Sequence, residues 1–253
     1  MRTEGTIGAA AVGTSLDCVR YPGKYRSPPL RGGITIYRMD SHGHRLPGQC
    51  TGAFIARSRV DGKLYMFTAG HCAAEAGTGL WATKFPGGSQ HVIGTVHHYV
   101  FCAAGDEAIL NSNNPSGWKL PRGWVYVLNG PHTTLNQQYA VSSAQYRTVG
   151  ARICETGAVS GSLCGTVAAL GRTICVGTSI TNCRWVSNLG EATIHSQPRD
   201  SGAPLYAAHQ AFGLVSAGGS DILHGGSVTF YQGINGASNA RNVNLVVAHP
   251  ACC

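Results

Sequence analysis

Short apolar runs separated by turn residues dominate this chain, and their spacing predicts β-strands rather than long helices. An Asp61-Gly62 pair between two of these runs is a strong signal for a hairpin turn. The end of the chain, residues 240–248, fits either a short helix or a strand. The runs that predict strands cover residues 34–37, 52–56, 64–68, 91–96, 138–148, 165–170, 172–179, 190–195, 213–217 and 228–232. Strands at this even spacing indicate an all-β barrel or sandwich.

The composition supports an all-β protein and indicates the kind of compartment in which it folds. Hydrophobic residues make up 43% of the 253 positions, charged ones only 12%, and 35 glycines favour tight turns. No stretch approaches the roughly 18 apolar residues needed to span a bilayer, so no membrane association is expected. Residues 1–17 lack the sustained apolar segment of a signal peptide. The ten cysteines show no zinc-type CxxC pairs, and they predict a disulfide framework in an oxidising compartment.

The formal charge of +8 raises the question of an acidic partner. The 19 Lys and Arg residues are scattered, however, and form no run that would follow a phosphate backbone. We therefore expect no specific binding of nucleic acid. The histidine pairs His42/His44 and His97/His98 lack a fuller set of ligands at a recognisable spacing, so neither a metal nor another cofactor is predicted.

Three short segments carry residues suited to nucleophilic catalysis: TAGHC with His71, GDEAIL with Asp106, and PRDSGAP with Ser201. A serine hydroxyl is a weak nucleophile near neutral pH, so it needs a base, and the base needs a partner that fixes its tautomer. Cys50 and Cys72 flank the strands around His71, and a disulfide between them would clamp its loop.

With these motifs the chain resembles the chymotrypsin-like serine proteases, in particular the bacterial streptogrisin and alpha-lytic protease branch. The resemblance covers about residues 32–248. It includes residues 154–167, which look like that branch's disulfide-closed loop between Cys154 and Cys164, and the segments 213–219 and 229–232, which look like its substrate-binding and final barrel strands.

The resemblance implies two antiparallel six-stranded β-barrels with the active site between them. Residues 1–31 would be an irregular N-terminal extension, 32–120 the N-terminal barrel with His71 and Asp106, and 121–253 a linker and the C-terminal barrel with Ser201.

The resemblance also implies the role of each site residue. Ser201 would attack the scissile carbonyl, His71 would act as the base, and Asp106 would orient His71. The backbone N–H groups of Arg199 and Ser201 would form the oxyanion hole. Ser216, Ala217 and Gly218 would pair with the substrate backbone.

Three residues depart from the family pattern. Arg199 replaces a glycine, and it would be strained if its position needs a positive φ. Its side chain would face solvent, or contact an acidic substrate group, or the oxyanion hole would stay collapsed until substrate binds. Glu155 stands where this branch tends to have an arginine that pairs with the aspartate matching Asp200. Asp200 then needs another cation, such as Arg152 or Arg199, or hydrogen-bond donors. Ala203 for a second glycine is a milder change.

The substrate pocket is expected to be open and mainly uncharged, because Val215, Ala217, Gly218 and Gly225-Gly226 are small or apolar. This predicts cleavage after medium or large apolar residues, with His195 leaving an acidic preference open. Cys175 and Cys183 are expected to staple a hairpin. Cys18 and Cys102 are each expected to meet one of the adjacent pair Cys252 and Cys253, since neighbouring cysteines rarely bond each other.

The leading hypothesis is a secreted, monomeric serine endopeptidase that acts on polypeptides through an acyl-enzyme. Arg199, Glu155 and Ala203 motivate the alternative, a catalytically impaired relative that binds peptides or proteins. A triad hydrolase acting on smaller esters is a third, weaker hypothesis.

Overall fold

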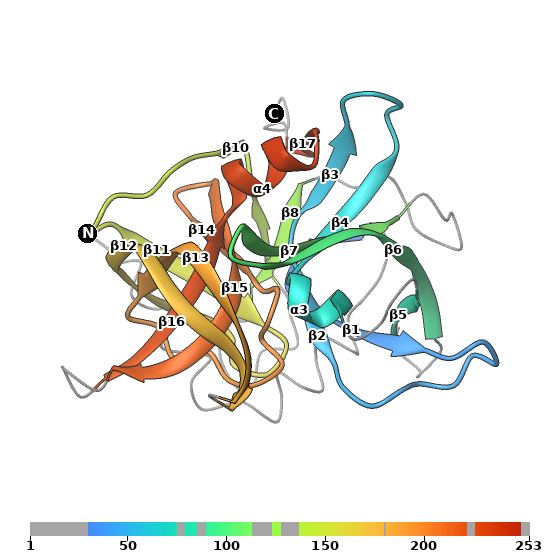
Figure 1. Cartoon of the computed structure of the whole chain (residues 1–253). Helices are drawn as coiled ribbons and strands as arrows, with labels where there is room; N and C mark the ends of the chain where they lie inside the picture. The colour runs from blue at the N-terminus through green and yellow to red at the C-terminus, as the bar shows by residue number, and fades with distance from the viewer. Residues whose placement is uncertain are drawn as a thin grey trace.

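Two large β-sheets, almost entirely antiparallel, form the two halves of the protein (Figure 1). The structure is a computed structural model and describes residues 30–74, 79–84, 90–112, 123–127, 137–179, 181–221 and 226–248. In Figure 1 the strands of the first half, coloured blue to green, lie beside those of the second half, coloured yellow to orange.

The first sheet closes into a ring of six strands when β2 and β3 are counted as one continuous segment. β1 pairs with both β2 and β5, while β3 pairs with β4, so the order runs β1, β2–β3, β4, β7, β6, β5 and back to β1. A short strand, β17, is added beside β3. The strands are β1 (Ile34–Met39), β2 (Cys50–Gly52), β3 (Ile55–Ser58), β4 (Leu64–Thr68), β5 (Leu80–Lys84), β6 (Gln90–Cys102), β7 (Gly105–Asn111) and β17 (Val243–Leu245).

The second sheet closes in the same way. Its order is β15, β14, β11, β12, β13 and β16, and a further pairing of β16 with β15 completes the ring, with short β10 alongside β15. The strands are β10 (Ser143–Ala144), β11 (Arg152–Gly157), β12 (Gly161–Ser179), β13 (Asn182–Ala192), β14 (Pro204–Ala207), β15 (Gln210–Asp221) and β16 (Gly226–Gly233). These pairings confirm the expected all-β class, and the two rings are consistent with two six-stranded barrels.

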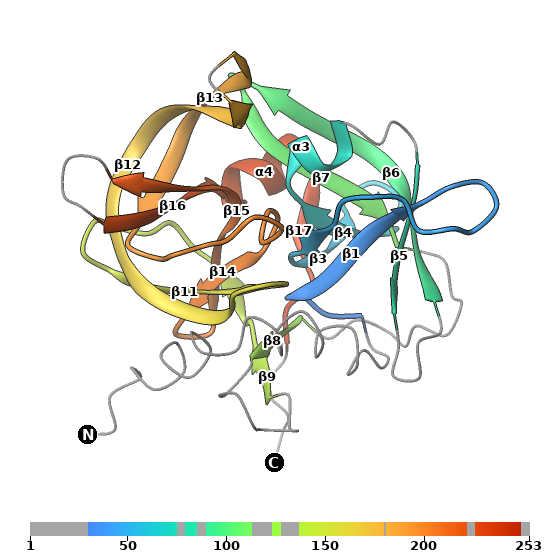
Figure 2. The same ribbon diagram turned by 90° about the horizontal axis from the view of Figure 1, so that it is seen from below.

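The remaining elements are small. β8 (Trp124–Val127) and β9 (Gln137–Ala140) form a separate hairpin below the two rings (Figure 2). The helices are α3 (Gly70–Ala74) and α4 (Ile234–Ala240). Within the described part of the chain, no helix is long and apolar enough to cross a membrane.

Buried apolar side chains form a core in each ring, and the core of the first ring extends to Tyr206 and Leu214 of the second. In the first, Ile34, Ile36, Met66 and Phe67 are almost fully buried. In the second, Ile153, Val167, Leu205, Phe212 and Val215 pack together. Both cores consist largely of β-branched and aromatic residues, which suit a pleated, half-buried surface.

The pattern located most strands but misjudged several lengths. The two runs expected at 165–170 and 172–179 form one strand, β12, that bends through several register shifts opposite β13. The hairpin at Asp61-Gly62 joins β3 to β4, with Gly62 at φ +71°. Of the two forms expected for residues 240–248, the strand occurs there as β17, whereas α4 precedes this stretch and ends at Ala240.

Three disulfides confirm three expected pairings: Cys50–Cys72, Cys154–Cys164 and Cys175–Cys183. Cys102 is exposed and bonds to none of the described cysteines. The partners expected for it, together with Cys18 and most of the 1–31 extension, lie outside the described residues.

Candidate active site

His71 stands at the start of α3, directly after β4, where the chain turns sharply. Gly70 makes this turn possible, because a Cβ there would collide with the carbonyl of Val100 and crowd the backbone of Glu107. The disulfide between Cys50 and Cys72 ties the same turn to β2. The His71 side chain is therefore held by its backbone on both sides and is 23% exposed.

Asp106 lies on β7 with no exposed surface and receives hydrogen bonds on both carboxylate oxygens. The His71 backbone N–H donates to Oδ1 at 2.7 Å, and His71 Nδ1 lies 2.8 Å from Oδ2. With its proton on Nδ1, the imidazole carries a lone pair on Nε2, and this nitrogen can accept a proton. Asp106 therefore sets both the position and the tautomer of His71.

Ser216 supplies a third hydrogen bond to Asp106 from the other half of the molecule. Its hydroxyl donates to Asp106 Oδ2 at 2.5 Å, and the side chain is buried. Val215 pairs with Tyr231 but Ala217 with Phe230, so β15 carries a bulge at Ser216. A bulge changes the direction in which a side chain points, and here it brings the hydroxyl to the neighbouring sheet.

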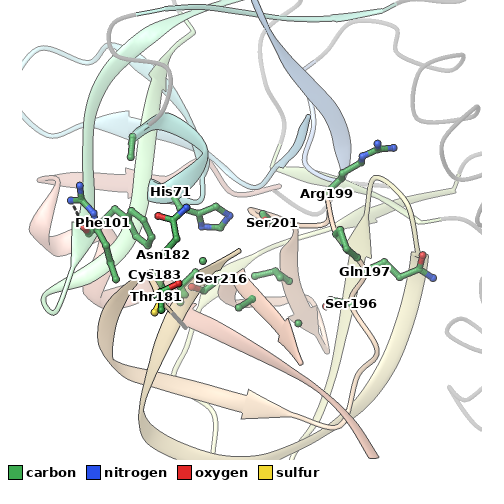
Figure 3. Close-up of a pocket in the computed structure, with 18 residues that line it drawn as sticks. His71, Phe101, Thr181, Asn182, Cys183, Ser196, Gln197, Arg199, Ser201 and Ser216 are labelled. Atoms are coloured by element: carbon green, nitrogen blue, oxygen red, sulfur yellow. Dashed lines mark hydrogen bonds between the residues drawn. The ribbon is translucent and has the colours of Figure 1, made fainter. Parts of the chain in front are cut away.

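Ser201 precedes β14 in a tight turn and lines the same pocket as His71. Figure 3 shows the His71 imidazole facing Ser201. Gly202 follows at φ +85°, and a Cβ there would meet the Thr68 hydroxyl and the Thr51 carbonyl. The glycine of Asp-Ser-Gly is thus required by both its dihedral angle and the lack of space.

Arg199 adopts φ +87°, which is the strained conformation foreseen for a side chain at this position. Its guanidinium is exposed and points away from the pocket (Figure 3), in line with the first of the three expected alternatives. In this turn the N–H groups of Asp200, Gly202 and Ala203 donate to carbonyl groups. Those of Arg199 and Ser201 donate to no acceptor in the described part of the chain.

Thr51, on β2 of the first ring, holds the turn that carries Ser201. Its backbone N–H donates to the Ser201 carbonyl at 2.8 Å, and its hydroxyl donates to the Arg199 carbonyl at 3.1 Å. The same hydroxyl accepts the N–H of Ala158 at 2.9 Å. The strained backbone at Arg199 therefore persists because residues from both rings fix it.

Asp200 is stabilised by hydrogen-bond donors and not by an arginine among the described contacts. The N–H groups of Gln197, Val159 and Ser160 donate to its carboxylate, at 2.8, 2.8 and 3.2 Å, and the Ser160 hydroxyl donates at 2.5 Å. Burial raises the pKa of Asp200, while these four donors lower it. The expected need for donors is met, and Arg199 faces solvent instead.

Glu155 is fully buried on β11 and has far fewer partners. Its Oε2 lies 2.6 Å from the Ser196 hydroxyl, and its Oε1 has no partner among the described residues. Burial raises the pKa of Glu155 well above its ordinary value, and the charge of Asp200 raises it further.

A cavity of about 600 Å³ opens beside His71 and Ser201, with walls from both rings (Figure 3). The first ring contributes Ala74 and Phe101, and the second contributes Val176, Val215 to Gly218 and the disulfide hairpin at Cys183. Arg184 links the two sides, since its guanidinium lies 5.5 Å from the Phe101 ring and donates to the Phe101 carbonyl at 3.3 Å. Gly225 lies outside the described residues.

His195, which left an acidic preference open, is exposed and does not line this cavity. His44 and His42 cluster with Asp40 in an exposed loop, where the two backbone N–H groups each donate to Oδ1 at 2.8 Å. No group of three or more metal-binding side chains occurs in the described ranges.

Sequence analysis missed the side chains that act across long separations. Ser216 was expected only as a backbone partner of substrate, and Ser160, Gln232 and Thr51 were not expected at all. Gln232 accepts the Asp106 N–H at 3.3 Å, although 126 positions separate the two residues. No local pattern encodes such contacts.

Comparison with known proteins agrees with this geometry. No protein-family model matches the chain. Serine protease 2 of Streptomyces fradiae is 29% identical over 78% of this chain and 99% of its own length. Streptogrisin-C of Streptomyces griseus is 28% identical over 87% of this chain, which spans only 41% of that longer protein.

Solved structures give the same result for the fold. A Nocardiopsis protease matches with a TM-score of 0.66 at 24% identity, over 86% of this chain and 98% of its own. A glutamic acid-specific serine protease, described as using a histidine triad in substrate binding, matches with a TM-score of 0.66 at 27% identity, over 85% of this chain and all of its own.

Together, the fold and these relatives support a chymotrypsin-like serine protease, a class of endopeptidases. Within that class, the similarity is to the bacterial streptogrisin branch.

Proposed function

We propose that the protein cuts peptide bonds with Ser201 as nucleophile, His71 as general base and Asp106 as the group that orients His71. The observation that carries this proposal is the pair of hydrogen bonds from His71 to Asp106, at 2.7 and 2.8 Å, beside the cavity that Ser201 lines. His71 Nε2 takes the proton of the Ser201 hydroxyl as its oxygen attacks the scissile carbonyl, and then passes that proton to the leaving amine. In the second half of the reaction, water attacks the acyl-enzyme, and His71 takes a proton from the water and returns it to Ser201.

The oxyanion formed in this attack would bind to the backbone N–H groups of Arg199 and Ser201. Both groups are free of described acceptors, and the positive φ of Arg199 sets the direction of its own N–H. Donors already held in position before the reaction stabilise a developing charge without reorganising. The contacts from Thr51 and Asp200 keep this turn rigid.

Substrate would bind as an added strand along β15. The pairing of β14 with β15 runs from Ala207↔Gln210 to Pro204↔Leu214, so no described strand pairs with this edge of β15 from Ser216 to Gly218. Main-chain hydrogen bonds there would give affinity without demanding a particular sequence. The cavity walls are mostly apolar or small, including Phe101, Val176 and Val215, which supports cleavage after medium or large apolar residues.

We further propose that the protein is secreted and acts as a monomer on extracellular polypeptides. The three disulfides favour an oxidising compartment. A fractionated culture of the source cells should contain the protein in the medium, and light scattering should give the mass of one chain.

A fluorophosphonate probe, followed by mass spectrometry of the digested adduct, tests the chemistry. Folded protein should carry the label on Ser201 alone, and prior denaturation should abolish it. The same sample should hydrolyse peptides from a broad library. Binding of peptides without label or turnover would instead support the alternative of an impaired relative, which the strained Arg199 backbone favours. A sample that turns over esters but not amides would support the small-ester hydrolase.

A further inference from the structure

Glu155, Ser196 and Thr229 form a buried chain of polar side chains that leads from the interior of the second ring to the wall of the cavity. Ser196 Oγ lies 2.6 Å from Glu155 Oε2 and 2.5 Å from Thr229 Oγ1. Thr229 Oγ1 in turn lies 3.0 Å from the Ile194 carbonyl oxygen. Only Ser196 of the three side chains lines the cavity.

Counting protons along this chain fixes the state of Glu155. Three oxygen–oxygen contacts at hydrogen-bond distance need one proton each, yet the hydroxyls of Ser196 and Thr229 supply only two. An ionised Glu155 would leave one contact with lone pairs facing each other, which is repulsive at 2.5 to 3.0 Å. The third proton can come only from the carboxyl group itself.

We propose that Glu155 is held as a neutral carboxylic acid that donates to Ser196, and that Ser196 thereby meets the substrate side chain as a hydrogen-bond acceptor. In this arrangement Glu155 donates to Ser196, Ser196 donates to Thr229, and Thr229 donates to the Ile194 carbonyl. Glu155 is a positioning residue, because it acts on substrate only through Ser196. This inference rests on the proposed protease function.

The surroundings of Glu155 favour the neutral form. Its cross-strand neighbours are Leu163 on β12 and Leu205 on β14, both buried and apolar. An isolated charge is very unfavourable in such a place. Its Oε1 has no described donor, so an ionised group would have a single hydrogen bond.

The other titratable groups nearby leave the charge on Asp200. Asp200 has four donors against one for Glu155, so Asp200 ionises first and its charge then opposes ionisation of Glu155. Tyr206 on β14 and Tyr231 on β16 stay protonated, because burial raises the pKa of each to about 12. His195, next to Ser196 in the chain, is exposed.

The consequence is a preference among substrates. Ser196 donates its only hydroxyl proton to Thr229 and accepts a hydrogen bond from Glu155. Its oxygen therefore offers the cavity one remaining lone pair and no proton. A side chain before the cut bond that ends in a donor, such as the glutamine amide, gains a hydrogen bond there. A glutamate carboxylate finds only an acceptor and is rejected. Apolar side chains avoid both effects and fill the rest of the cavity.

The Glu155→Gln variant tests the protonation state without any activity measurement. A glutamine amide donates to Ser196 as the neutral acid does but cannot ionise. Wild-type Glu155 keeps its proton when folded and loses it when unfolded above about pH 4.5, so rising pH destabilises only the wild type. The unfolding constant of the wild type should therefore grow relative to that of E155Q, by up to about tenfold per pH unit as the pH rises above about 5. Asp200 and Glu107 are present in both proteins, so their pH-dependent contributions cancel in the ratio of the two unfolding constants.

Glu191→Gln is the matched control, because Glu191 lies on β13 of the same sheet and is paired with Arg172. Its unfolding constant should show no such relative gain with pH. A constant ratio for E155Q as well would overturn the inference. If E155Q does not fold, infrared spectra of a Glu107→Gln protein decide instead: the carbonyl stretch of a protonated carboxyl should persist at pH 8, and its absence would overturn the inference.

Selectivity is the second readout. On matched peptides with glutamine or glutamate before the cut bond, the wild type should favour glutamine at least tenfold in kcat/KM at pH 7. The preference should grow at alkaline pH as Glu155 ionises, because the carboxylate still takes the Ser196 proton and its charge adds a repulsion of glutamate. E155Q has no such charge, so its preference should stay constant with pH. An equal rate on both peptides at pH 7, or a rise at high pH that is equally large in E155Q, would contradict the positioning role. Labelling of Ser201 by fluorophosphonate is scored separately, so its failure would count against the proposed function and not against the state of Glu155.

Discussion

Two fully buried carboxyl groups, Asp106 and Glu155, each contact a side chain that lines the cavity, His71 and Ser196, but their surroundings differ. Asp106 accepts two hydrogen bonds from His71 and one from Ser216, so both of its carboxylate oxygens have donors. Glu155 has one contact and an unpartnered oxygen. The two carboxyl groups are equally buried, so the difference between them is the number of donors, and each donor favours the charged form of a buried carboxyl group.

The largest effect is expected from changing the well-satisfied group. Asp106→Asn should lower kcat about 10⁴-fold, because an amide that replaces the carboxylate holds His71 in the wrong tautomer. Steady-state kinetics on a peptide substrate would measure this loss. Asp61→Asn, in the exposed β3–β4 turn, is the control and should leave kcat unchanged. A loss below tenfold for D106N would show that Asp106 is not the orienting group.

The disulfide that clamps the His71 turn comes next. Replacing Cys50 and Cys72 together by alanine opens a loop with a sequence separation of 22 and should cost about 3 kcal/mol in the free energy of unfolding. The same change at Cys175 and Cys183, with a separation of only 8, should cost less. Chemical denaturation of the two double variants gives the ranking, and the reverse order would show that the His71 clamp is not the stronger constraint.

Glu107, the neighbour of Asp106 in sequence, is a third buried carboxyl group, and its effect on stability should depend on pH. It is buried with one oxygen unpartnered and with Arg241 3.6 Å away, and burial raises its pKa to about 7. The folded state thus binds its proton more tightly than the unfolded state does. The free energy of unfolding should fall by up to about 1.4 kcal/mol per pH unit as pH rises from about 4.5 towards 7. Glu107→Gln should remove this part of the pH dependence, and chemical denaturation of the variant and the wild type at several pH values would measure it. An unchanged pH dependence would show that another group causes it.

The smallest effect concerns the strained residue beside Ser201. At φ +87°, glycine is unstrained, whereas any residue with a Cβ is not. Both Arg199→Gly and Arg199→Ala remove the long side chain, but only glycine also removes the backbone strain. The free energy of unfolding of Arg199→Gly should therefore be about 1 kcal/mol larger than that of Arg199→Ala. Thermal unfolding of the two variants isolates the backbone term. Equal stability would mean that the turn relaxes when Arg199 is replaced.

Much of this molecule was predictable because its signals are local. The strands follow from apolar runs and turn residues, and the hairpin follows from Asp61-Gly62. His71, Asp106 and Ser201 stand in short motifs, and the contacts of His71 with Asp106 agree with the predicted pairing. The assignment of catalytic roles itself stays a prediction until activity is measured.

What could not be predicted depends on contacts between distant segments. The bulge that turns Ser216 towards Asp106 arises from a register shift between β15 and β16, and strand register is a property of the closed ring. The hydrogen-bond donors to Asp200 were likewise not predictable, because they include the backbone N–H groups of Val159 and Ser160, 40 positions or more away. Arg199 was recognised as a strained candidate, but its dihedral angle and outward side chain needed coordinates.

Thr51 has one more consequence. Its backbone and hydroxyl, on the first ring, hold the turn of the second ring that bears Ser201 and Arg199. We expect the turn to hold this shape only when both rings are in place, because its partner Thr51 lies on the other ring. Any activity measured for Ser201 would then report on the packing of the two rings as well as on the chemistry.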